Sequence, residues 1–317
     1  MKWRRFALAS AVLALLVAAG WWGQVQRNRA AAWALVHKAL EFHRRWVAGG
    51  AVQWSVRLPD GRWLTQTAQI SLTRRALQVR AAGVDLICQL PECRVAVRAP
   101  SQLHVAAEEA NQLLNAARRW ALLRCNYRAE PAGTISVAGR FCQLVRLIPR
   151  RREAFERRFA IDPETGMILR QEVIDRDGTV LSSVQWRKVQ EQRRQPHPAV
   201  AASQRVTRLP RWAATLPYGF VVAQVLRSRC TCCPCGMAAQ VIHATDGAAD
   251  VAIYLLEHPQ RQRGCPYCRL PRRTPYYTRI GALTTVAVGE PQPIVVIGDA
   301  PAHTLMAIAD IVLRKGR

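Results

Sequence analysis

Apolar and polar residues alternate along short segments of the first 190 residues, as they do in half-buried β-strands. In 51–57, for example, Val52, Trp54 and Val56 are each followed by a polar residue. Turn sequences such as Asp175–Gly178 separate the segments, which predicts an antiparallel meander. The expected strands are 51–57, 63–72, 77–79, 84–88, 94–98, 135–137, 141–148, 159–161, 167–174 and 180–189.

Two other segments follow the helical period. The first, 26–48, has an apolar stripe and is expected to end at Gly49–Gly50. The second is expected to run from a capping Ser101 to about Arg124. The stripe of the first helix consists of Trp33, Val36, Leu40 and Val47. Strands and helices together predict a mainly β fold with some α, of the α+β class, in a first domain at 26–190.

A second, smaller domain is predicted at 212–317. Residues 191–211 lack periodicity and contain three prolines, as an interdomain linker does. The chain closes with a helix beginning at Pro301, because proline fits the first turn of a helix. The expected strands of this domain are 220–226, 240–243, 251–256, 282–288 and 294–297.

The N-terminal residues 1–25 have the pattern of a signal anchor or a signal peptide. A basic start is followed by the uncharged segment Phe6–Trp22, and then by Arg27 and Arg29. The length of the apolar segment favours an uncleaved transmembrane anchor over a cleaved signal peptide. Both interpretations place the rest of the chain outside the cytoplasm, either anchored or secreted.

The charge of the chain is strongly basic. Lysine and arginine number 46 against 21 acidic residues, for a net charge of +25, and only four of the basic residues are lysine. This surplus favours anionic partners such as acidic lipid headgroups or an acidic protein segment. Because export removes the chain from most nucleic acid, no nucleic-acid partner is expected. An arginine-rich but merely solvated surface stays open as an alternative.

Six of the ten cysteines lie in one insert, 229–270. They are Cys230, Cys232, Cys233, Cys235, Cys265 and Cys268. Disulfides are favoured for them, since thiols outside the cytoplasm are readily oxidised. Zinc is the alternative, because two C-x-x-C knuckles supply four thiolates for a tetrahedral site. Its ligands would be Cys232, Cys235, Cys265 and Cys268.

A third alternative for the insert is thiol oxidoreductase chemistry at Cys265 and Cys268. The sequence Cys-Pro-Tyr-Cys is a glutaredoxin-type motif. Such a motif normally opens a helix, whose dipole lowers the pKa of the first thiol, but here loop sequence lies on both sides. Redox catalysis is therefore the least favoured of the three.

The first domain has a separate set of four cysteines. Cys88 and Cys93 are candidates for a local disulfide, and Cys125 and Cys142 for one that ties the second helix to a strand. Buried free thiols are the alternative, since cysteine is common in protein cores.

No pattern in the chain predicts an enzyme. There is no G-x-G-x-x-G sequence and no P-loop lysine. His243, Asp246 and His303 have no nucleophile in a recognisable context. Apart from the possible zinc, no cofactor is expected.

Several motifs resemble the RseB/MucB family of periplasmic sigma-factor regulators. In the first domain they lie in Val137–Pro149 and Phe159–Val189. In the second domain they are Pro217–Phe220, Thr245–Gly247 and the segment Ile294–Ala300 with Pro301 and Thr304. The resemblance covers roughly residues 35–317, and the cysteine insert is not part of the family pattern.

The resemblance implies a fold and a function. The first domain is expected to be a LolA-like curved antiparallel half-barrel closed by helices, and the second a small mixed sheet ending in a helix. The family binds the extracytoplasmic segment of an anti-sigma factor, a single-span membrane protein, and responds to lipid. The resemblance therefore implies a regulatory binding protein with a possible lipid or acyl ligand. A lipid or lipoprotein carrier is the alternative that the half-barrel suggests.

Overall fold

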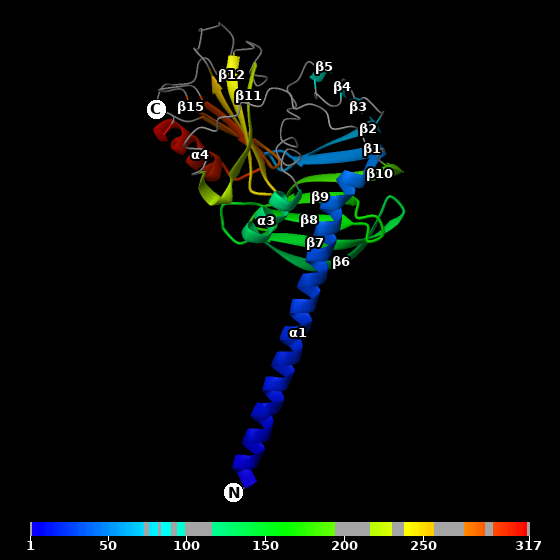
Figure 1. Cartoon of the computed structure of the whole chain (residues 1–317), viewed down its shortest axis with the longest axis vertical. Coiled ribbons are helices and arrows are strands. Elements are labelled where there is room, and N and C mark those ends of the chain that lie inside the picture. Colours follow the sequence, from blue (N-terminus) through cyan, green and yellow to red (C-terminus); the bar gives the residue numbers. More distant parts are fainter. Residues whose placement is uncertain are drawn as a thin grey trace.

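The computed structural model describes two antiparallel sheets, one in each domain (Figure 1). It describes residues 2–72, 76–81, 84–89, 94–98, 116–193, 216–229, 238–256, 276–288 and 294–315. The linker residues 194–215, most of the predicted helix at 101–124, and seven of the ten cysteines lie outside these ranges. So do the side chains of residues 1–17 and 71–98.

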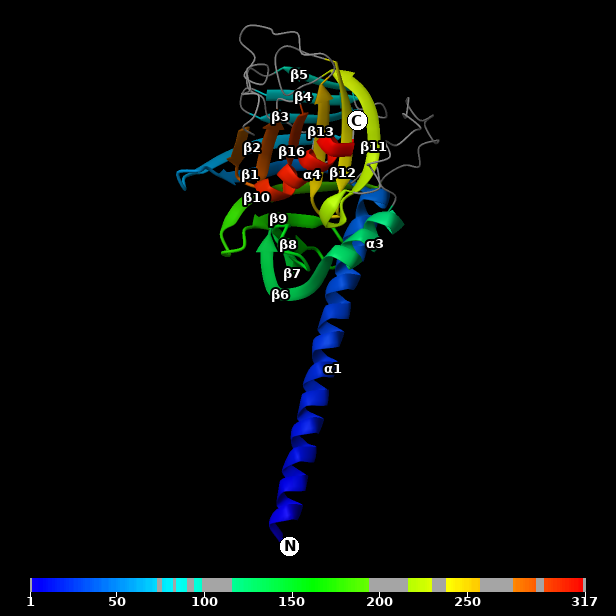
Figure 2. The same cartoon turned by 90° about the vertical axis from the view of Figure 1, so that its left-hand side faces the viewer.

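Sheet A is a ten-stranded antiparallel sheet in the order β5-β4-β3-β2-β1-β10-β9-β8-β7-β6. Its strands are β1 (Trp46–Arg57), β2 (Trp63–Leu72), β3 (Ala76–Ala81), β4 (Val84–Gln89), β5 (Arg94–Arg98), β6 (Tyr127–Val137), β7 (Arg140–Pro149), β8 (Glu156–Ile161), β9 (Ile168–Ile174) and β10 (Val180–Arg193). The sheet is curved and open, with helices against it (Figures 1 and 2). The predicted meander and the mainly β, α+β class are confirmed.

Helix α1 (Lys2–Arg45) is a single helix of 44 residues that leaves the body of the molecule at its N-terminal end (Figure 1). Its apolar stripe, which includes Trp33 and Val36, packs on Tyr127 and Leu147 of sheet A. Among the described residues, none of the helices has an apolar stretch of the length that crossing a membrane requires. The side chains of residues 1–17 lie outside that part, so the predicted N-terminal anchor stays a prediction.

The predicted end of the first helix at Gly49–Gly50 is wrong. The helix ends at Arg45, and both glycines lie inside β1. Gly50 has a φ of +137°, and a Cβ there would collide with the carbonyl oxygen of Lys188 on β10. The glycine therefore permits a close approach of two strands beside a register shift at Ala51/Val52.

The second helix of this domain is described only as α3 (Ala116–Asn126). It leads directly into β6 and crosses α1, where the Trp33 and Trp120 rings meet edge to face with centroids 5.2 Å apart. The Arg124 guanidinium lies over the Trp33 ring at 5.2 Å. This end of α3 is thereby fixed against both α1 and the edge of sheet A.

Sheet B forms the second domain and has six strands in the order β11-β12-β13-β16-β15-β14. They are β11 (Val221–Arg229), β12 (Ala238–Thr245), β13 (Asp250–Leu256), β14 (Tyr276–Ile280), β15 (Leu283–Val288) and β16 (Ile294–Gly298), preceded by a 3-10 turn, η2 (Pro217–Gly219). Every described pairing is antiparallel, so the expected mixed sheet is wrong. The closing helix is confirmed as α4 (Ala302–Lys315).

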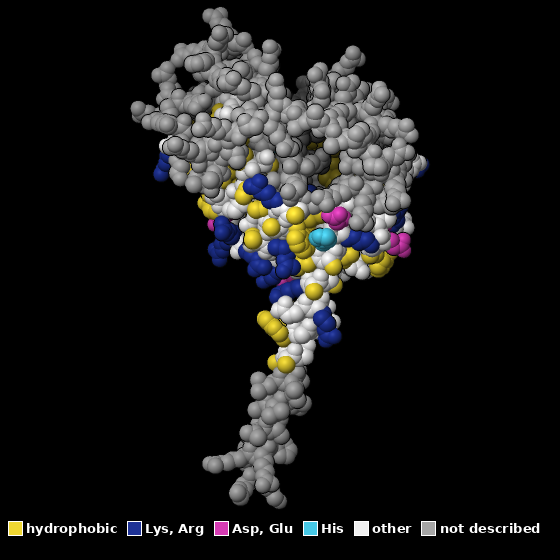
Figure 3. Space-filling model, in the orientation of Figure 1, with side chains coloured by type: hydrophobic (Ala, Val, Ile, Leu, Met, Phe, Trp, Pro, Cys, Tyr) yellow, Lys and Arg dark blue, Asp and Glu magenta, His cyan; other side chains and the backbone are white. Residues whose placement is uncertain are grey.

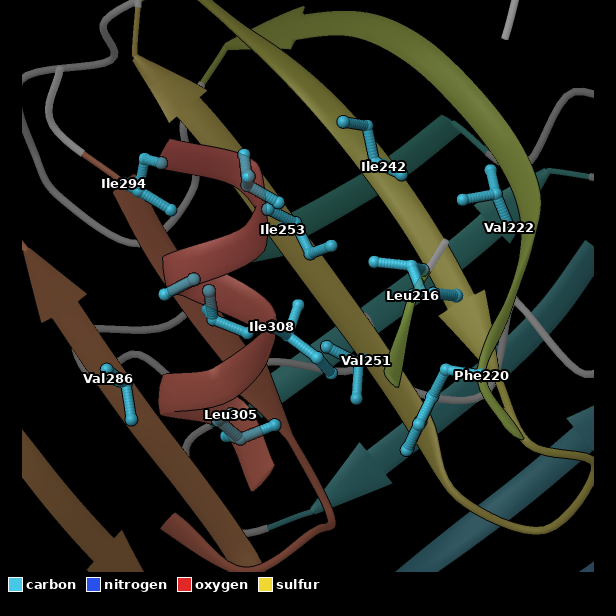
Figure 4. Packing of buried hydrophobic residues seen from close by; sticks show 14 of the residues in the cluster. Leu216, Phe220, Val222, Ile242, Val251, Ile253, Val286, Ile294, Leu305 and Ile308 are labelled. Carbon is cyan, nitrogen blue, oxygen red and sulfur yellow. The ribbon is translucent and has the colours of Figure 1, made fainter. Parts of the chain in front are cut away.

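Both faces of the central strands of sheet B are buried. Leu305 and Ile308 of α4 pack on Ile253 and other apolar residues of one face (Figure 4). On the opposite face, side chains such as Tyr254 and Ile297 are also buried. That face is turned toward β1–β5 of sheet A (Figures 1 and 2). The second domain thus stands against one half of sheet A, and α1 covers the other half.

Candidate functional site

The two domains meet at a cluster of ionisable side chains that we call the polar seam. It consists of Tyr127 and Arg157 from sheet A, and Asp246, Asp250 and Asp299 from the second domain. Four of the five are buried, and the Asp299 side chain is 21% exposed. Charged groups are rarely buried unless they are paired, so this cluster has a specific role at the junction.

Tyr127 is the first residue of β6, immediately after α3. Its hydroxyl donates a hydrogen bond of 2.7 Å to Oδ2 of Asp246, in the turn between β12 and β13. The other carboxylate oxygen of Asp246 accepts bonds from the backbone N–H groups of Ala248 and Ala249. The Asp246 carboxylate therefore shapes its own turn and binds the first domain at the same time.

Arg157 is the only cation of the polar seam and is fully buried. Its Nη2 lies 2.7 Å from Oδ2 of Asp299 and donates to the Asp299 carbonyl oxygen at 3.0 Å. Asp299 follows β16, and its Oδ1 accepts the backbone N–H of Asp250 at 2.7 Å. The Arg157 guanidinium of the first domain is thus bound where β13 begins and β16 ends in the second domain.

Burial and mutual charge shift the pKa values of the seam. The pKa of Tyr127 is raised well above its ordinary value by burial and by the nearby Asp246. The pKa of Asp246 is raised by burial. The pKa of Asp250 is raised well above its ordinary value by burial and by the charge of Asp299. Burial lowers the pKa of Arg157, but Asp299, Tyr127 and Asp246 together more than offset this effect, and the pKa of Arg157 is raised.

Hydrogen bonds from side chains of α3 to backbone carbonyls hold this helix against the turn between β12 and β13. The side-chain amide of Asn126 donates to the Asp246 carbonyl at 2.8 Å, and Nε of Arg119 donates to the Gly247 carbonyl at 3.1 Å. Gly247 has a φ of +104°, and a Cβ there would lie 2.9 Å from the Leu123 backbone nitrogen. Only glycine lets the turn come this close to the helix.

The domains also meet at a second place, which we call the hairpin contact. Here the turn between β14 and β15, Gly281 and Ala282, sits against residues of sheet A and its β7–β8 loop. Ala282 is buried in one cluster with Phe155, Val173 and Leu181. The Gly281 N–H donates to the carbonyl of Arg57 at 2.9 Å, and a Cβ on Gly281 would lie 2.9 Å from the Leu181 carbonyl oxygen. This contact is mainly apolar and closely packed.

The predicted disulfide between Cys125 and Cys142 is wrong, because both are free thiols. Cys125 is exposed at the end of α3. Cys142 is buried on β7 in an apolar cluster with Phe42 of α1, and burial raises the pKa of its thiol. Cys142 is therefore a core residue, as in the alternative considered from the sequence.

The remaining cysteines lie outside what the structure describes, apart from the backbone of Cys88 in β4. The described residues contain no group of His, Cys, Asp and Glu that could hold a metal ion. Disulfide, zinc and redox roles for Cys230, Cys232, Cys233, Cys235, Cys265 and Cys268, and a Cys88–Cys93 disulfide, stay predictions. His243 is buried on β12, and burial lowers its pKa.

Sequence reasoning singled out Thr245–Gly247 as a motif but missed Arg157. One signal was available: along β8, Arg157 shares a face with Phe159 and Ile161, two apolar positions in the same alternation. An arginine on the apolar face of a strand indicates a buried ion pair. Its partner, Asp299, is 142 residues further along the chain and no local pattern reveals it.

The described surface is basic beside the base of α1. On the face shown in Figure 3, Lys and Arg side chains gather around the body near α1, with fewer acidic side chains among them. Arg150, Arg151 and Arg152 are consecutive exposed residues after β7. Positive charge in this region favours an anionic partner.

A curved sheet, a second sheet docked on it and a buried polar seam define a two-domain protein with a fixed domain orientation. Residues 91–206, most of which lie in the first domain, match the family model of the MucB/RseB N-terminal domain. A search of curated proteins finds no match.

Solved structures show the same fold over both domains. A crystal structure of MucB is 16% identical, with a TM-score of 0.57, and covers 88% of this chain and 96% of its own. The structure of MucB in complex with MucA(peri) is 18% identical with a TM-score of 0.54, covering 88% and 97%. The MucA/MucB complex from Pseudomonas aeruginosa is 19% identical with a TM-score of 0.52, covering 88% and 97%.

Proposed function

We propose that this chain is an extracytoplasmic regulatory protein that binds the extracytoplasmic segment of an anti-sigma factor. The observation that carries this proposal is the two-domain architecture shared with MucB, including MucB bound to MucA(peri), together with the family match. The polar seam supports it, because a fixed domain orientation keeps a binding surface that spans both domains preorganised.

The direct test is binding of the full chain, in detergent, to the extracytoplasmic segment of a single-span anti-sigma factor from the same organism. Calorimetry is expected to give a dissociation constant of about 1 μM or tighter. A shuffled-sequence peptide of the same composition is the control for charge alone, since the chain is strongly basic. No binding at that concentration would count against the proposal.

We further propose an acyl ligand as the signal that this protein senses. The observation that favours it is the partial exposure of apolar side chains on sheet A, where Leu64 and Val184 are each 43% exposed. Both lie on the face of Val56, which contacts the second domain. Mass spectrometry of lipid extracted from the purified protein tests this, and extracts free of acyl chains would contradict it. A carrier function would require such lipid to transfer between membranes.

For the N-terminus, we propose export with retention of residues 1–25 as an anchor. The uncharged segment Phe6–Trp22 supports this. Fractionation of cells that make the full chain, followed by N-terminal sequencing, distinguishes an anchored protein from one cleaved and released.

For the cysteine insert, we propose disulfides, with zinc as the alternative. The described strand ends support a shared module: Arg229 pairs with Ala238, and Ala239 pairs with Leu256. The two cysteine-bearing segments therefore leave sheet B from neighbouring strands at the same end. Counting free thiols and zinc in protein purified without reductant separates the two. A reactive Cys265 thiol would instead favour the oxidoreductase.

A further inference from the structure

Strand β14 is the last strand of sheet B and pairs only with β15 among the described strands. Ile280 and Leu283 face each other across the two-residue turn Gly281–Ala282. In such a hairpin the residues flanking the turn form a hydrogen-bonded pair, and bonded and non-bonded pairs then alternate along the strands. The backbone N–H and C=O groups of Tyr277 and Arg279 therefore point away from β15.

The side chains of this edge are unusually apolar and exposed. Tyr277 is 63% exposed and Ile280 is 51% exposed. The Arg279 guanidinium forms an ion pair with Asp175, directly after β9 of sheet A, in which Nη1 lies 3.2 Å from Oδ2. Folded proteins normally protect sheet edges with charges, prolines, bulges or a covering helix, because unpaired backbone groups attract other strands.

Strand β6, one of the two edge strands of sheet A, is protected in several of these ways. Strand β6 contains Pro131, and its register with β7 shifts between Pro131 and Thr134. Helix α1 packs beside this strand, and Arg29 of the helix reaches Glu130 at 3.4 Å. Among the described residues, β14 contains no proline and keeps its register with β15 throughout, and Arg279 is its one charge. As the structure describes them, β14 is therefore the less protected of these two edges.

We propose that β14 is the docking edge for an extended segment of the partner, which adds to sheet B as a seventh strand. The inference rests on the proposed function and specifies how that partner is held. An extended chain is the occupant that satisfies outward-pointing N–H and C=O groups, while its side chains contact Tyr277 on one face of the sheet and Ile280 on the other.

The surroundings of β14 favour a long partner segment over a second copy of this chain. The strand has five residues, which is little for a stable dimer, since specific interfaces bury about 800 Å² on each side. A segment longer than β14 can continue past Gly281, where the backbone meets Val56, onto Leu64 beside it. The partner segment is therefore expected to be extended, with apolar residues on both faces where it passes Tyr277 and Ile280.

The test is hydrogen exchange of the full chain, with and without the extracytoplasmic segment used above. On binding, the amides of Tyr277 and Arg279 are expected to exchange at least about tenfold more slowly. Binding that leaves both amides unprotected would overturn the edge inference while the proposed function stands. An absence of binding would contradict the proposed function itself, so the two failures are distinguishable.

A pair of variants at Tyr277 distinguishes the contribution of its backbone N–H to partner binding from that of its side chain. Tyr277→Pro removes an N–H that β15 does not use, and proline is tolerated on edge strands. Tyr277→Ala removes the same side chain but keeps the N–H. We expect Tyr277→Pro to bind about tenfold more weakly than Tyr277→Ala, with equal unfolding midpoints. Equal affinities would overturn the inference, as would amide protection that appears at high protein concentration without partner.

Discussion

The polar seam holds five ionisable side chains between the two domains, whereas the hairpin contact joins the same domains through apolar side chains and closely approaching backbone. Among the described residues of the seam, the Arg157 guanidinium is bound to Asp299 alone, through two oxygen atoms, and the Tyr127 hydroxyl to Asp246 alone. In the hairpin contact, Ala282 packs among several apolar neighbours. Hydrogen-bonded ion pairs tolerate few geometries, while apolar contacts tolerate many. The seam thus sets the orientation of the domains, and the hairpin contact stabilises their association by burying apolar side chains.

The largest effect is expected from breaking the seam at its cation. Arg157→Met removes the guanidinium that is paired with the Asp299 carboxylate, and it takes one nearby positive charge away from Asp246 and Asp250. Removal of one partner of a buried ion pair costs about 3–5 kcal/mol, and we expect a loss in that range in urea unfolding.

The matched control for this change is the double variant Arg157→Met with Asp299→Leu, which removes both charges of the pair. It is expected to recover part of the loss, because no unpaired charge then remains between these two positions. A loss below about 1 kcal/mol for the single variant would show that the seam does not hold the domains.

The second effect tests the hairpin contact. Gly281→Ala adds a Cβ 2.9 Å from the Leu181 carbonyl, at a φ of +60°. We expect a loss of about 2–3 kcal/mol in thermal or urea unfolding, from backbone strain and overpacking together. Gly178→Ala is the control: its φ is +84° but its Cβ would meet nothing within 4 Å, so it reports backbone strain alone. Equal losses for the two variants would mean that the contact is not closely packed.

A smaller change probes a single hydrogen bond of the seam. Tyr127→Phe keeps the ring and removes the donor to Asp246. We expect a loss of about 1–2 kcal/mol, because a buried acceptor then lacks its partner. Combined with Arg157→Met in a double-mutant cycle, the two losses are expected not to add, since both act on one network. Losses in unfolding free energy that add strictly would show that Tyr127 and Arg157 act independently of each other.

The smallest effect is a dependence on pH. The pKa of Asp250 is raised by burial and by Asp299, so the folded state keeps the proton to a higher pH than the unfolded state does. Its contribution to stability is present at low pH and is lost as pH rises through the raised pKa. Relative to the parent, Asp250→Asn is therefore expected to gain stability progressively as pH rises from about 4, the ordinary pKa of an unfolded aspartate, through the raised pKa of the folded state.

His243 acts in the opposite direction, because burial lowers its pKa and its neutral form is favoured in the folded state. It is present in both proteins, so it cancels in their difference. Unfolding free energies measured across the pH range for the two proteins give the result. A constant difference would contradict the raised pKa of Asp250.

Local pattern predicted most strands, the closing helix and the β12–β13 turn, because alternation and turn chemistry are local properties. It did not predict the seam. Tyr127 and Asp246 are 119 residues apart, and their contact depends on how two sheets dock. Gly50 shows the same limit on a smaller scale: a glycine pair reads as a helix end, yet its purpose depends on Lys188 in a distant strand.

The continuity of α1 determines how this protein is presented to its surroundings. At 1.5 Å per residue, a helix of 44 residues is about 66 Å long, and only its C-terminal part is embedded in the body. A flexible tether would let the body tumble and sample a large volume. A stiff rod instead keeps the orientation of the body constant relative to the N-terminal tip of the helix, about 66 Å from its C-terminal end.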